Sequence, residues 1–380
     1  MLYNYRMIEI KEVKTRKEKK DFVDFPIKLY ANCPYYVPNL RTDEFALFNP
    51  KKNVSYDDCD IVFYVAYKDG KPAGRICGIV QKVYNKMQNV KRVRFTRFDV
   101  IEDFEVAKAL LETVEKWAKE QEMDTVHGPL GFNDLDREGL LVEGFDELST
   151  YESDYSYPYY AEFLEKLGYT KEVDWVEFQI KAIKDVDDRI KRLSKAVKQR
   201  YHLKIATAKN KKDYINKYMA GIFETIDAAY GELYGVIPYT DKLQQQIVSQ
   251  FKLMISLDCM VTILDQNDKV VAFGFGLPSL AKAVQKSKGR LNLTGIIRIL
   301  HAAKHIKVFD FGLIAVRPEY QGKGLTAIII EQMVQQMSKY DLEYCETNHS
   351  LETNQKIILT WKNFENCRQH KRRRCYVKKL

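Results

Sequence analysis

Apolar positions along the chain recur with two different spacings, and the change from one to the other predicts a succession of strands and helices. In the first half, a two-residue period on either side of Lys68-Asp69-Gly70 predicts a β-hairpin. A three- to four-residue period over 105–120 predicts a helix, and a further strand is expected over 173–180. The segment 182–198, which is charged and lacks glycine, is expected to form a helical connector.

The second half repeats this order of elements. It predicts helices over 213–230, 241–256 and 325–340, a hairpin around Gln266-Asn267-Asp268 and a strand over 308–316. We interpret the chain as one unit used twice, with a chance similarity of ordinary α/β segments as the alternative. We therefore predict one domain over residues 1–181, a connector over 182–200 and a second domain over 201–380.

The junction after the strand 308–316 carries the most specific chemistry. Pro318 cannot donate to a β-ladder, so the strand should end near it. The turn Gln321-Gly322-Lys323-Gly324 follows and opens the helix. Glycine lets main-chain amides approach a ligand, and a helix N-terminus adds unpaired donors and a positive dipole. The stretch predicts a phosphate-binding loop, with an ordinary strand–turn–helix junction as the alternative.

Composition and charge narrow the class of protein without naming its ligand. The 380 residues include 25 Tyr and 19 Phe and few Pro or Gly, which is typical of a folded chain with two cores. The net charge of +9 suits an anionic small molecule and would also suit nucleic acid. Charge alone therefore does not decide between them.

The seven cysteines predict a reducing compartment rather than a metal site. They form no Cys-x-x-Cys pair, and Cys345 and His349 lack the further ligands of a zinc site, so no metal is expected. The N-terminal segment is lysine-rich rather than apolar, so we expect no signal peptide. No apolar run reaches membrane-spanning length. We expect a cytoplasmic protein without a membrane partner.

The loop motif resembles the pyrophosphate loop of the GNAT superfamily, the acyl-CoA-dependent N-acyltransferases, whose pattern is Gln/Arg-x-x-Gly-x-Gly/Ala. Gln321 and Gly324 match it, whereas Thr326 stands where the superfamily has Gly or Ala. The segment 163–169, Phe-Leu-Glu-Lys-Leu-Gly-Tyr, is similar to the superfamily's signature near the end of its domain. The element order is also that of a GNAT domain. The resemblance implies an α/β (or α+β) fold of two tandem GNAT-like domains, each a mostly antiparallel mixed sheet flanked by helices.

Longer motifs resemble a narrower group of two-domain bacterial GNAT-like proteins of undefined substrate. These motifs lie at 128–129, 139–146, 158–160, 289–291 and 351–354. In the first half, no glycine stands where the pyrophosphate loop should be. The acidic residues at that position would repel phosphate, and they are Asp99, Glu102, Asp103 and Glu105. We therefore expect the first domain to be a degenerate copy and the second to bind the cofactor.

The resemblance implies acetyl-CoA or another acyl-CoA as the cofactor. The end of the strand 308–316 should pair its backbone with the pantetheine arm, and the loop after it should hold the pyrophosphate. Asn354 matches the superfamily asparagine that contacts the pantetheine, unless it is only a helix N-cap. The residues implied for cofactor binding are Ile314, Ala315, Val316, Gln321, Gly322, Lys323, Gly324, Leu325, Thr326 and Asn354.

In this superfamily the amine attacks the thioester directly, so the protein positions the reactants, removes one proton and stabilises an oxyanion. For the base we favour Glu346, on the strand expected beside the thioester, ahead of Asp310 on the preceding strand. His349 and His305 are further candidates.

Trp361 stands where the superfamily has the tyrosine that protonates the leaving thiolate, and indole cannot act as a general acid at neutral pH. Tyr344, Tyr340 or Tyr376 would then substitute. The remaining alternatives are that water protonates the thiolate or that the protein does not turn over.

The resemblance places the acceptor pocket at the loop 231–239, where Glu232, Tyr234 and Tyr239 offer polar and aromatic contacts or simply pack. The basic insertion 289–307 would either clamp the 3′-phosphate of the cofactor or cover the sheet. The run Lys371-Arg372-Arg373-Arg374 is expected on a solvated edge strand rather than in a nucleic-acid patch.

Three functions follow from these features. The first is N-acyl transfer, most simply of acetyl, from acyl-CoA to a primary amine of a small molecule or peptide. The second is aminoacyl transfer from aminoacyl-tRNA, against which the CoA-type loop argues, so we do not expect a nucleic-acid partner. The third is acyl-CoA binding by a regulator without turnover. A homodimer is left open.

Overall fold

The computed structural model describes residues 8–251 and 256–380. The elements of the first half are β1 (Ile8–Glu12), α1 (Arg16–Leu29), α2 (Arg41–Ala46), β2 (Cys59–Lys68), β3 (Lys71–Gln81), α3 (Lys82–Gln88), β4 (Arg92–Val100), α4 (Phe104–Glu120), β5 (Thr125–Gly128), β6 (Leu140–Glu143), α5 (Tyr159–Lys166) and β7 (Thr170–Lys181). Within the described ranges, no helix combines the length and the apolar character needed to cross a membrane.

The second half follows a connecting helix. Its elements are α6 (Asp188–Arg200), β8 (Lys204–Ile205), α7 (Lys211–Tyr230), α8 (Asp241–Phe251), β9 (Met260–Leu264), β10 (Val270–Pro278), α9 (Ala281–Ser287), α10 (Leu293–Lys304), β11 (Val308–Val316), α11 (Leu325–Met337), β12 (Tyr344–Glu346), β13 (Ser350–Leu351), α12 (Gln355–Lys362) and β14 (Cys367–Lys379). The two predicted hairpins are confirmed as β2–β3 and β9–β10, and the connector helix as α6. Of the helix predicted over 241–256, α8 covers the part up to Phe251, and 252–255 lie outside the described residues.

One continuous sheet runs through both halves, in the order β1-β2-β3-β4-β5-β14-β7-β12-β11-β10-β9-β8. The pairs β4–β5 and β11–β12 are parallel, and the other neighbours on this path are antiparallel. The predicted fold class, a mostly antiparallel mixed sheet flanked by helices in each half, is confirmed. The domain boundaries stay a prediction.

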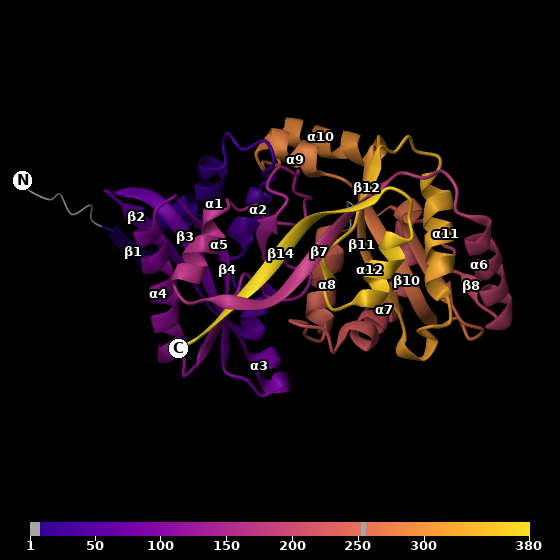
Figure 1. Cartoon of the computed structure of the whole chain (residues 1–380), viewed down its shortest axis with the longest axis horizontal. Coiled ribbons are helices and arrows are strands. Elements are labelled where there is room, and N and C mark those ends of the chain that lie inside the picture. Colours follow the sequence, from indigo (N-terminus) through magenta and orange to yellow (C-terminus); the bar gives the residue numbers. More distant parts are fainter. Residues whose placement is uncertain (1–7, 252–255) are drawn as a thin grey trace, which may run out of the picture.

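The halves are joined because each contributes its last strand to the other. β7 pairs with β12 of the second half, and β14 pairs with β5 of the first half. β7 and β14 also pair with each other over most of their length. Figure 1 shows these two strands side by side across the centre of the molecule, with the C-terminus lying in the first half. No pattern in the sequence predicts this exchange.

The exchange overturns the prediction that Lys371–Arg374 lie on a solvated edge. β14 is an interior strand, and Lys371 and Arg373 are fully buried. Both form ion pairs with Glu177 of β7: Lys371 Nζ lies 3.2 Å from one carboxylate oxygen, and Arg373 Nε lies 2.6 Å from the other. Burial opposes ionisation of Glu177, but Arg373 and Lys371 lower its pKa below the ordinary value. Arg372 and Arg374 alternate with them and are partly exposed, but both pair with Asp174, so the basic run offers no unpaired cationic patch.

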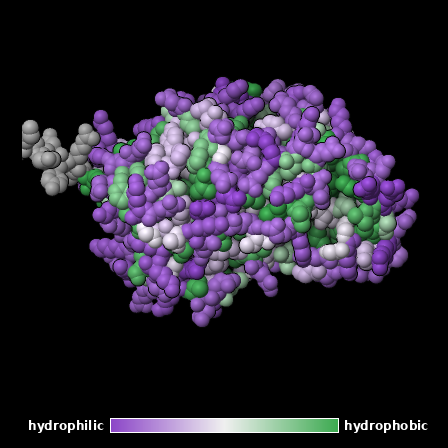
Figure 2. Space-filling view, in the orientation of Figure 1, coloured by the Kyte–Doolittle hydropathy of each residue, from purple (hydrophilic) through white to green (hydrophobic). Residues whose placement is uncertain are grey.

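Two structurally equivalent helices show how local sequence sets the two cores. α4 is capped by Asp103 and buries Val106, Leu110 and Val114 against the first part of the sheet. α11 buries a similar apolar face, which includes Ile328, in the second core. Figure 2 shows hydrophilic residues over most of the surface in this view, with hydrophobic residues gathered mainly in the region of α12, β11 and α11.

The feature that positions the site is the separation of β11 from β12. These parallel strands pair only from Val308 to Asp310. From Phe311 to Val316, β11 has β10 on one side and no paired strand on the other among the described residues. Toward its end, where the predicted loop begins, this edge of β11 therefore lacks a strand partner, and we call this unpaired edge the slot.

Candidate active site

The loop between β11 and α11 has the backbone that an anion site requires. Gly322 and Gly324 adopt φ values of +74° and +85°, a region that residues with a side chain seldom adopt. Gly324 is the N-cap of α11, and no side chain caps this helix. Within the described chain, the amides of Gly322, Gly324, Leu325 and Thr326 have no recorded protein acceptor. These donors are free for a ligand at the positive end of the helix.

The loop also has room and positive charge. A Cβ atom on Gly322 would meet no other atom within 4 Å, and Gln321, Gly322 and Lys323 are exposed. The Lys323 ammonium lies 5.2 Å from the ring centres of Tyr201 and Tyr320, which holds it beside the loop. The residues present therefore fit a diphosphate.

The connector helix α6 supports this loop from behind. A Cβ atom on Gly324 would lie 3.1 Å from a methyl group of Val197, so a larger residue here would be tightly packed against α6. On the next turns of α11, Glu331 accepts a hydrogen bond from Ser194 and lies 3.6 Å from Lys198. The contact fixes the start of α11 against α6.

Corresponding positions in the first half are filled by the protein itself. The Asp103 carboxylate accepts hydrogen bonds from the amides of Glu105 and Val106 at 3.1 and 3.3 Å, so the donors at the start of α4 are taken. At the end of β4, the amide of Val100 bonds to the Tyr160 hydroxyl at 2.8 Å. These contacts support the interpretation of the first half as a degenerate copy.

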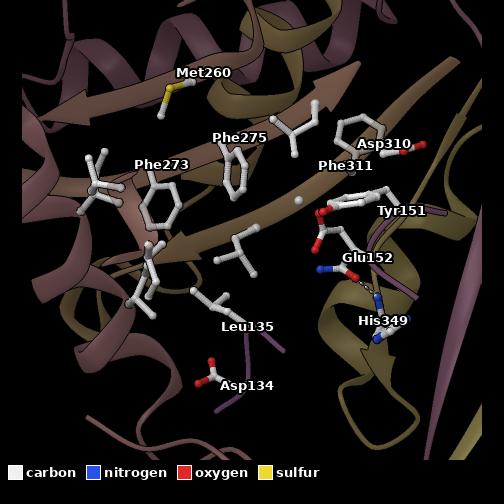
Figure 3. Close-up of a pocket in the computed structure, with 18 of the residues that line it drawn as sticks. Asp134, Leu135, Tyr151, Glu152, Met260, Phe273, Phe275, Asp310, Phe311 and His349 are labelled. Carbon is white, nitrogen blue, oxygen red and sulfur yellow. Dashed lines mark hydrogen bonds between the residues drawn. The ribbon is translucent and has the colours of Figure 1, made fainter. Parts of the chain in front are cut away.

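A cavity of about 120 Å³ lies beside the slot, between the sheet and helices α7 and α8. That is room for about four water molecules. Its wall is mainly apolar, and the apolar residues include Met219, Ile222, Phe223, Ile226, Ile247, Val248, Met260, Phe273, Phe275, Leu277, Phe311 and Leu313. Figure 3 shows Phe273, Phe275 and Met260 on one side of the cavity, and Tyr151, Glu152, Asp310 and His349 toward the other. The cavity is thus apolar with one polar end.

A groove of about 330 Å³ adjoins this cavity and is lined by residues of both halves. The two spaces share Tyr151 and Glu152, which come from the first half, and Leu280 from the second. Asp43 and Arg97 are among the charged residues of the groove. The polar end of the cavity therefore continues into a polar passage between the halves.

Two carboxyl groups at the polar end each carry a buried oxygen that has no hydrogen-bond partner in the described chain, Glu152 Oε1 and Asp310 Oδ1. His349 Nε2 instead lies 3.5 Å from Glu177 Oε1. Burial raises the pKa of Glu152 to about 7. Burial and the neighbouring Glu346 raise the pKa of Asp310 to about 8. Burial lowers the pKa of His349 to about 4, so its imidazole is neutral at pH 7. Unsatisfied buried groups are costly, and two of them at one end of the cavity indicate a polar ligand group at this point.

Of the predicted bases, the structure brings Asp310 to the cavity and places Glu346 behind it. The two residues are neighbours in the β11–β12 register. Glu346 is buried, accepts a hydrogen bond from Lys371 at 3.2 Å and lies 2.8 Å from His370 Nε2. It does not line the cavity. Its charge is engaged within the protein, and its effect on the site is to favour the protonated form of Asp310.

The residues predicted to serve the leaving group and the pantetheine are placed as follows. Tyr344 is half-buried, and burial together with Glu346 raises its pKa to about 12. Trp361 is buried, its ring centre 5.2 Å from that of Phe311. Asn354 caps α12 by accepting from the Ile357 amide at 3.5 Å. Trp361 therefore packs against β11, but its indole cannot protonate the leaving thiolate.

The end of β11 keeps part of its backbone occupied. The carbonyl of Ile314 accepts from the Tyr230 hydroxyl at 2.8 Å, and that of Val316 accepts from Gln321 Nε2 at 3.3 Å. Ala315 pairs with Phe273 of β10. Cofactor binding by these main-chain groups stays a prediction.

None of the three residues predicted for acceptor binding lines the cavity. Glu232 is exposed. Tyr234 reaches into the sheet of the first half, where its hydroxyl bonds to Glu172 and lies 2.7 Å from His127 Nδ1. Tyr239 donates to Asp134 at 2.7 Å, and Asp134 does line the cavity. The acceptor role of these residues stays a prediction, and their contacts here are with other protein groups.

The basic insertion lies at the other end of β11 from the loop. α10 ends shortly before Val308, whereas the loop follows Val316. Nine residues of strand span about 30 Å, so the insertion covers the top of the sheet rather than clamping a phosphate (Figure 1).

Residue-by-residue reasoning missed Glu152 and the apolar wall. Glu152 lies in the first half and reaches the site only through the packing of the halves. The stripe Met219, Ile222, Phe223 and Ile226 on α7 has helical spacing, which is equally typical of a filled core.

Comparison with known structures defines the class of fold. A tandem GNAT protein from the clavulanic acid biosynthesis pathway matches with a TM-score of 0.58 at 10% identity, over 98% of each chain. The chain therefore has the GNAT fold in its tandem form. No protein-family model matches the sequence.

Two relatives are similar in sequence over most of their length. Protein YghO of Escherichia coli strain K12 is 26% identical over 349 residues, which cover 89% of this chain and 87% of YghO. A protein named bacterial ceramide synthase from Caulobacter vibrioides strain NA1000 / CB15N is 22% identical over 312 residues, which cover 81% of this chain and 80% of that protein.

Proposed function

We propose that the protein is an acyl-CoA-dependent N-acyltransferase whose acceptor is a primary amine attached to an apolar chain. The observation that carries this proposal is the position of Asp310, which lies where the slot beside β11 begins and also lines the cavity. The tandem GNAT fold supports acyltransferase activity in general terms. The acceptor class rests on the cavity.

Several residues of the chain have distinct roles in the proposed reaction. Acyl-CoA supplies a thioester, and the loop amides around Gly322 and Gly324 hold its diphosphate. An ammonium group enters the polar end of the cavity, where Glu152 and Asp310 attract it. Ionised Asp310 takes one proton from the ammonium group, the freed amine nitrogen bonds to the acyl carbon, and the carbon–sulfur bond breaks. The second proton lost from that nitrogen passes through water to the leaving thiolate, since Trp361 has no acidic proton to give.

The apolar wall favours a hydrocarbon chain on the acceptor over a peptide. Burial of apolar groups against residues such as Phe273 and Ile226 stabilises an alkyl chain by about 0.8 kcal/mol for each methylene. The relative named a bacterial ceramide synthase agrees with this choice, because a ceramide is an amide of a long-chain amine.

A second candidate is a regulator that binds acyl-CoA without turnover. It is favoured by Trp361, which is buried in the core at the position of the superfamily tyrosine. Thiol release in the presence of amines distinguishes the two functions.

Acyl-CoA should raise the melting temperature of the full chain, because a ligand that binds only the folded state stabilises it by about 2.7 kcal/mol at a hundred times its Kd. Differential scanning fluorimetry with acetyl-CoA, a long-chain acyl-CoA and pantetheine measures this. Pantetheine lacks the diphosphate and should give a much smaller shift. Equal melting temperatures with and without every acyl-CoA would remove the basis of the proposal.

Narrowing the cavity should select against amines with long chains. Val248 is half-buried on α8 and lines the cavity, so Val248→Trp should raise the KM for a long-chain amine at least about tenfold and spare a short one. Gln245→Trp, at an exposed position of the same helix that does not line this cavity, is the matched control. Steady-state kinetics with an alkylamine series measures the effect. An equal loss for all chain lengths would show that the chain does not enter this cavity.

A further inference from the structure

Helix α10 presents an apolar stripe to solvent. Leu293, Ile296, Ile297 and Leu300 are 75, 43, 56 and 51% exposed. Their spacing of three, four and seven residues places them on one face of the helix. We call this set the α10 face. Single exposed apolar residues are ordinary, but a contiguous stripe of four large ones marks an interaction surface.

The α10 face is held in place by the opposite side of the helix. Ile299 and Ala302 pack on the cluster that contains Val284 of α9. α9 is in turn tied to the first half, because Gln285 Nε2 donates to the carbonyls of Pro34 and Tyr36 at 2.8 and 2.9 Å. Figure 1 shows α9 and α10 together at the top of the molecule. The exposed stripe is thus part of the folded protein and not a frayed end.

The charged residues around the α10 face are all basic. No Asp or Glu occurs between Asp268 and Asp310, while seven Lys and Arg residues lie within 281–307. All seven are exposed, and in the described chain Lys307 alone pairs with a carboxylate, Asp341 at 2.6 Å. The apolar stripe is therefore bordered by cations that lack counter-charges.

We propose that the α10 face docks the protein on the surface of an anionic lipid bilayer. An amphipathic helix with large apolar residues on one face and Lys or Arg beside them lies in the interface between headgroups and acyl chains. Clusters of four to eight such cations on an amphipathic helix are attracted to anionic lipids. Membrane association of this kind needs no spanning helix.

The same charges argue against two other occupants. A symmetric contact between two copies would bring the α10 faces together and oppose their cations. Nucleic acid would satisfy the cations and leave Leu293 and Ile297 in water. A bilayer satisfies both the apolar stripe and the charge.

Docking would also bring the acceptor to the site, and this consequence rests on the proposed function. The polar groove between the halves is lined by Leu291, just before α10, and by Ile299 in the middle of α10, on the side opposite the α10 face. An amine with an apolar chain resides in a bilayer, so docking through α10 would bring the groove close to such an acceptor. The docking itself does not depend on the reaction.

Vesicle flotation of the full chain tests the docking. The protein should float with phosphatidylcholine vesicles that contain phosphatidylglycerol, and much less with phosphatidylcholine alone. Raising the salt above ~0.15 M should weaken the binding, because ions screen the attraction. An absence of flotation with the anionic vesicles at low salt would overturn the proposal.

Two variants separate the apolar and the ionic contributions to vesicle binding. The triple change Leu293→Ser, Ile297→Ser and Leu300→Ser, and the double change Arg298→Glu and Lys304→Glu, should each lower the partition coefficient at least about tenfold. All five residues are exposed, so the melting temperature should change little. The matched controls are Met87→Ser and the double change Lys86→Glu and Lys119→Glu, at exposed positions of α3 and α4, and these should bind like the unaltered protein.

Two other outcomes would also contradict the proposal. Flotation that persists in both α10 variants would place the lipid-binding surface elsewhere. A dimer that dissociates in the α10 variants, without vesicle binding by the unaltered chain, would assign the face to a second copy. Acyl transfer to a soluble short amine should be unchanged in the α10 variants, which keeps this test independent of the proposed reaction.

Discussion

Replacing Asp310 by asparagine should reduce acyl transfer by about 10²- to 10⁴-fold, the usual contribution of a positioned general base. The asparagine keeps the shape of the side chain at the polar end of the cavity but cannot take the amine proton. The loop amides are untouched, so the melting shift with acyl-CoA should persist. Thiol release and scanning fluorimetry on the same preparation measure both quantities. Full activity in Asp310→Asn would show that another group is the base.

The pH dependence of the reaction follows from the pKa of Asp310, which is about 8. The carboxylate is the active form, so kcat/KM should rise with pH and level off above pH 8. Glu346 raises this pKa, and Glu346→Gln should therefore move the rise to lower pH without abolishing it. An unchanged profile in Glu346→Gln would contradict the electrostatic coupling of the two residues.

The same pKa shift has a consequence for stability. In the unfolded chain an aspartate has a pKa of about 4, so between pH 4 and 8 the folded state binds more protons at Asp310 than the unfolded state. This group therefore lowers the free energy of unfolding as the pH rises through that range. Asp310→Asn removes the effect and should melt no lower than the unaltered protein at pH 8, which confirms that the variant is folded.

Changing Gly322 to aspartate should weaken acyl-CoA binding at least about fivefold, and up to about a thousandfold. A unit charge about 4 Å from a phosphate costs about 1 kcal/mol in water and about 4 kcal/mol in a partly buried setting. Aspartate tolerates the positive φ of this position, and its Cβ would meet no neighbour within 4 Å. Isothermal titration calorimetry measures the affinity.

Gly322→Asn is the matched control for this change. Asparagine has the same shape and the same tolerance of positive φ but carries no charge. The control should bind acyl-CoA within a few-fold of the unaltered protein. Equal affinities for the aspartate and asparagine variants would mean that no phosphate lies near Gly322.

What could be predicted from the sequence depends on whether the relevant contacts are local. The loop at Gln321–Gly324 was predictable because a strand end, a proline, two glycines and a helix start lie within a short segment. The prediction of a degenerate first half is equally local, because no glycine and several acidic residues, Asp103 among them, stand where its loop should be.

The parts that sequence analysis missed depend on strands that are distant in the chain. Lys371 and Arg373 looked like edge cations, and Arg373 is neutralised by Glu177, 196 residues earlier. Glu346 was favoured as the base, yet Lys371 of the exchanged strand β14 engages it. Glu152 meets Asp310 at the cavity only because the two halves pack together. No periodicity in the sequence encodes these contacts.

The strand exchange also explains why both halves are needed for one site. The second half supplies the loop, the slot and the apolar wall, whereas the first half supplies Tyr151 and Glu152 at the polar end. Because β7 lies beside β12, the position of Glu346 behind Asp310 depends on a strand of the first half. The first half is thus part of the proposed acceptor site.

The central claim is that this chain joins an acyl group from acyl-CoA to an amine that carries an apolar chain. The most direct measurement mixes the full protein with acyl-CoA and a long-chain primary amine, and follows free thiol together with the mass of the product. We predict one amide formed for each thiol released, and little product from a short polar amine. Binding of acyl-CoA without thiol release for any amine in the series would contradict the claim and leave the non-catalytic regulator.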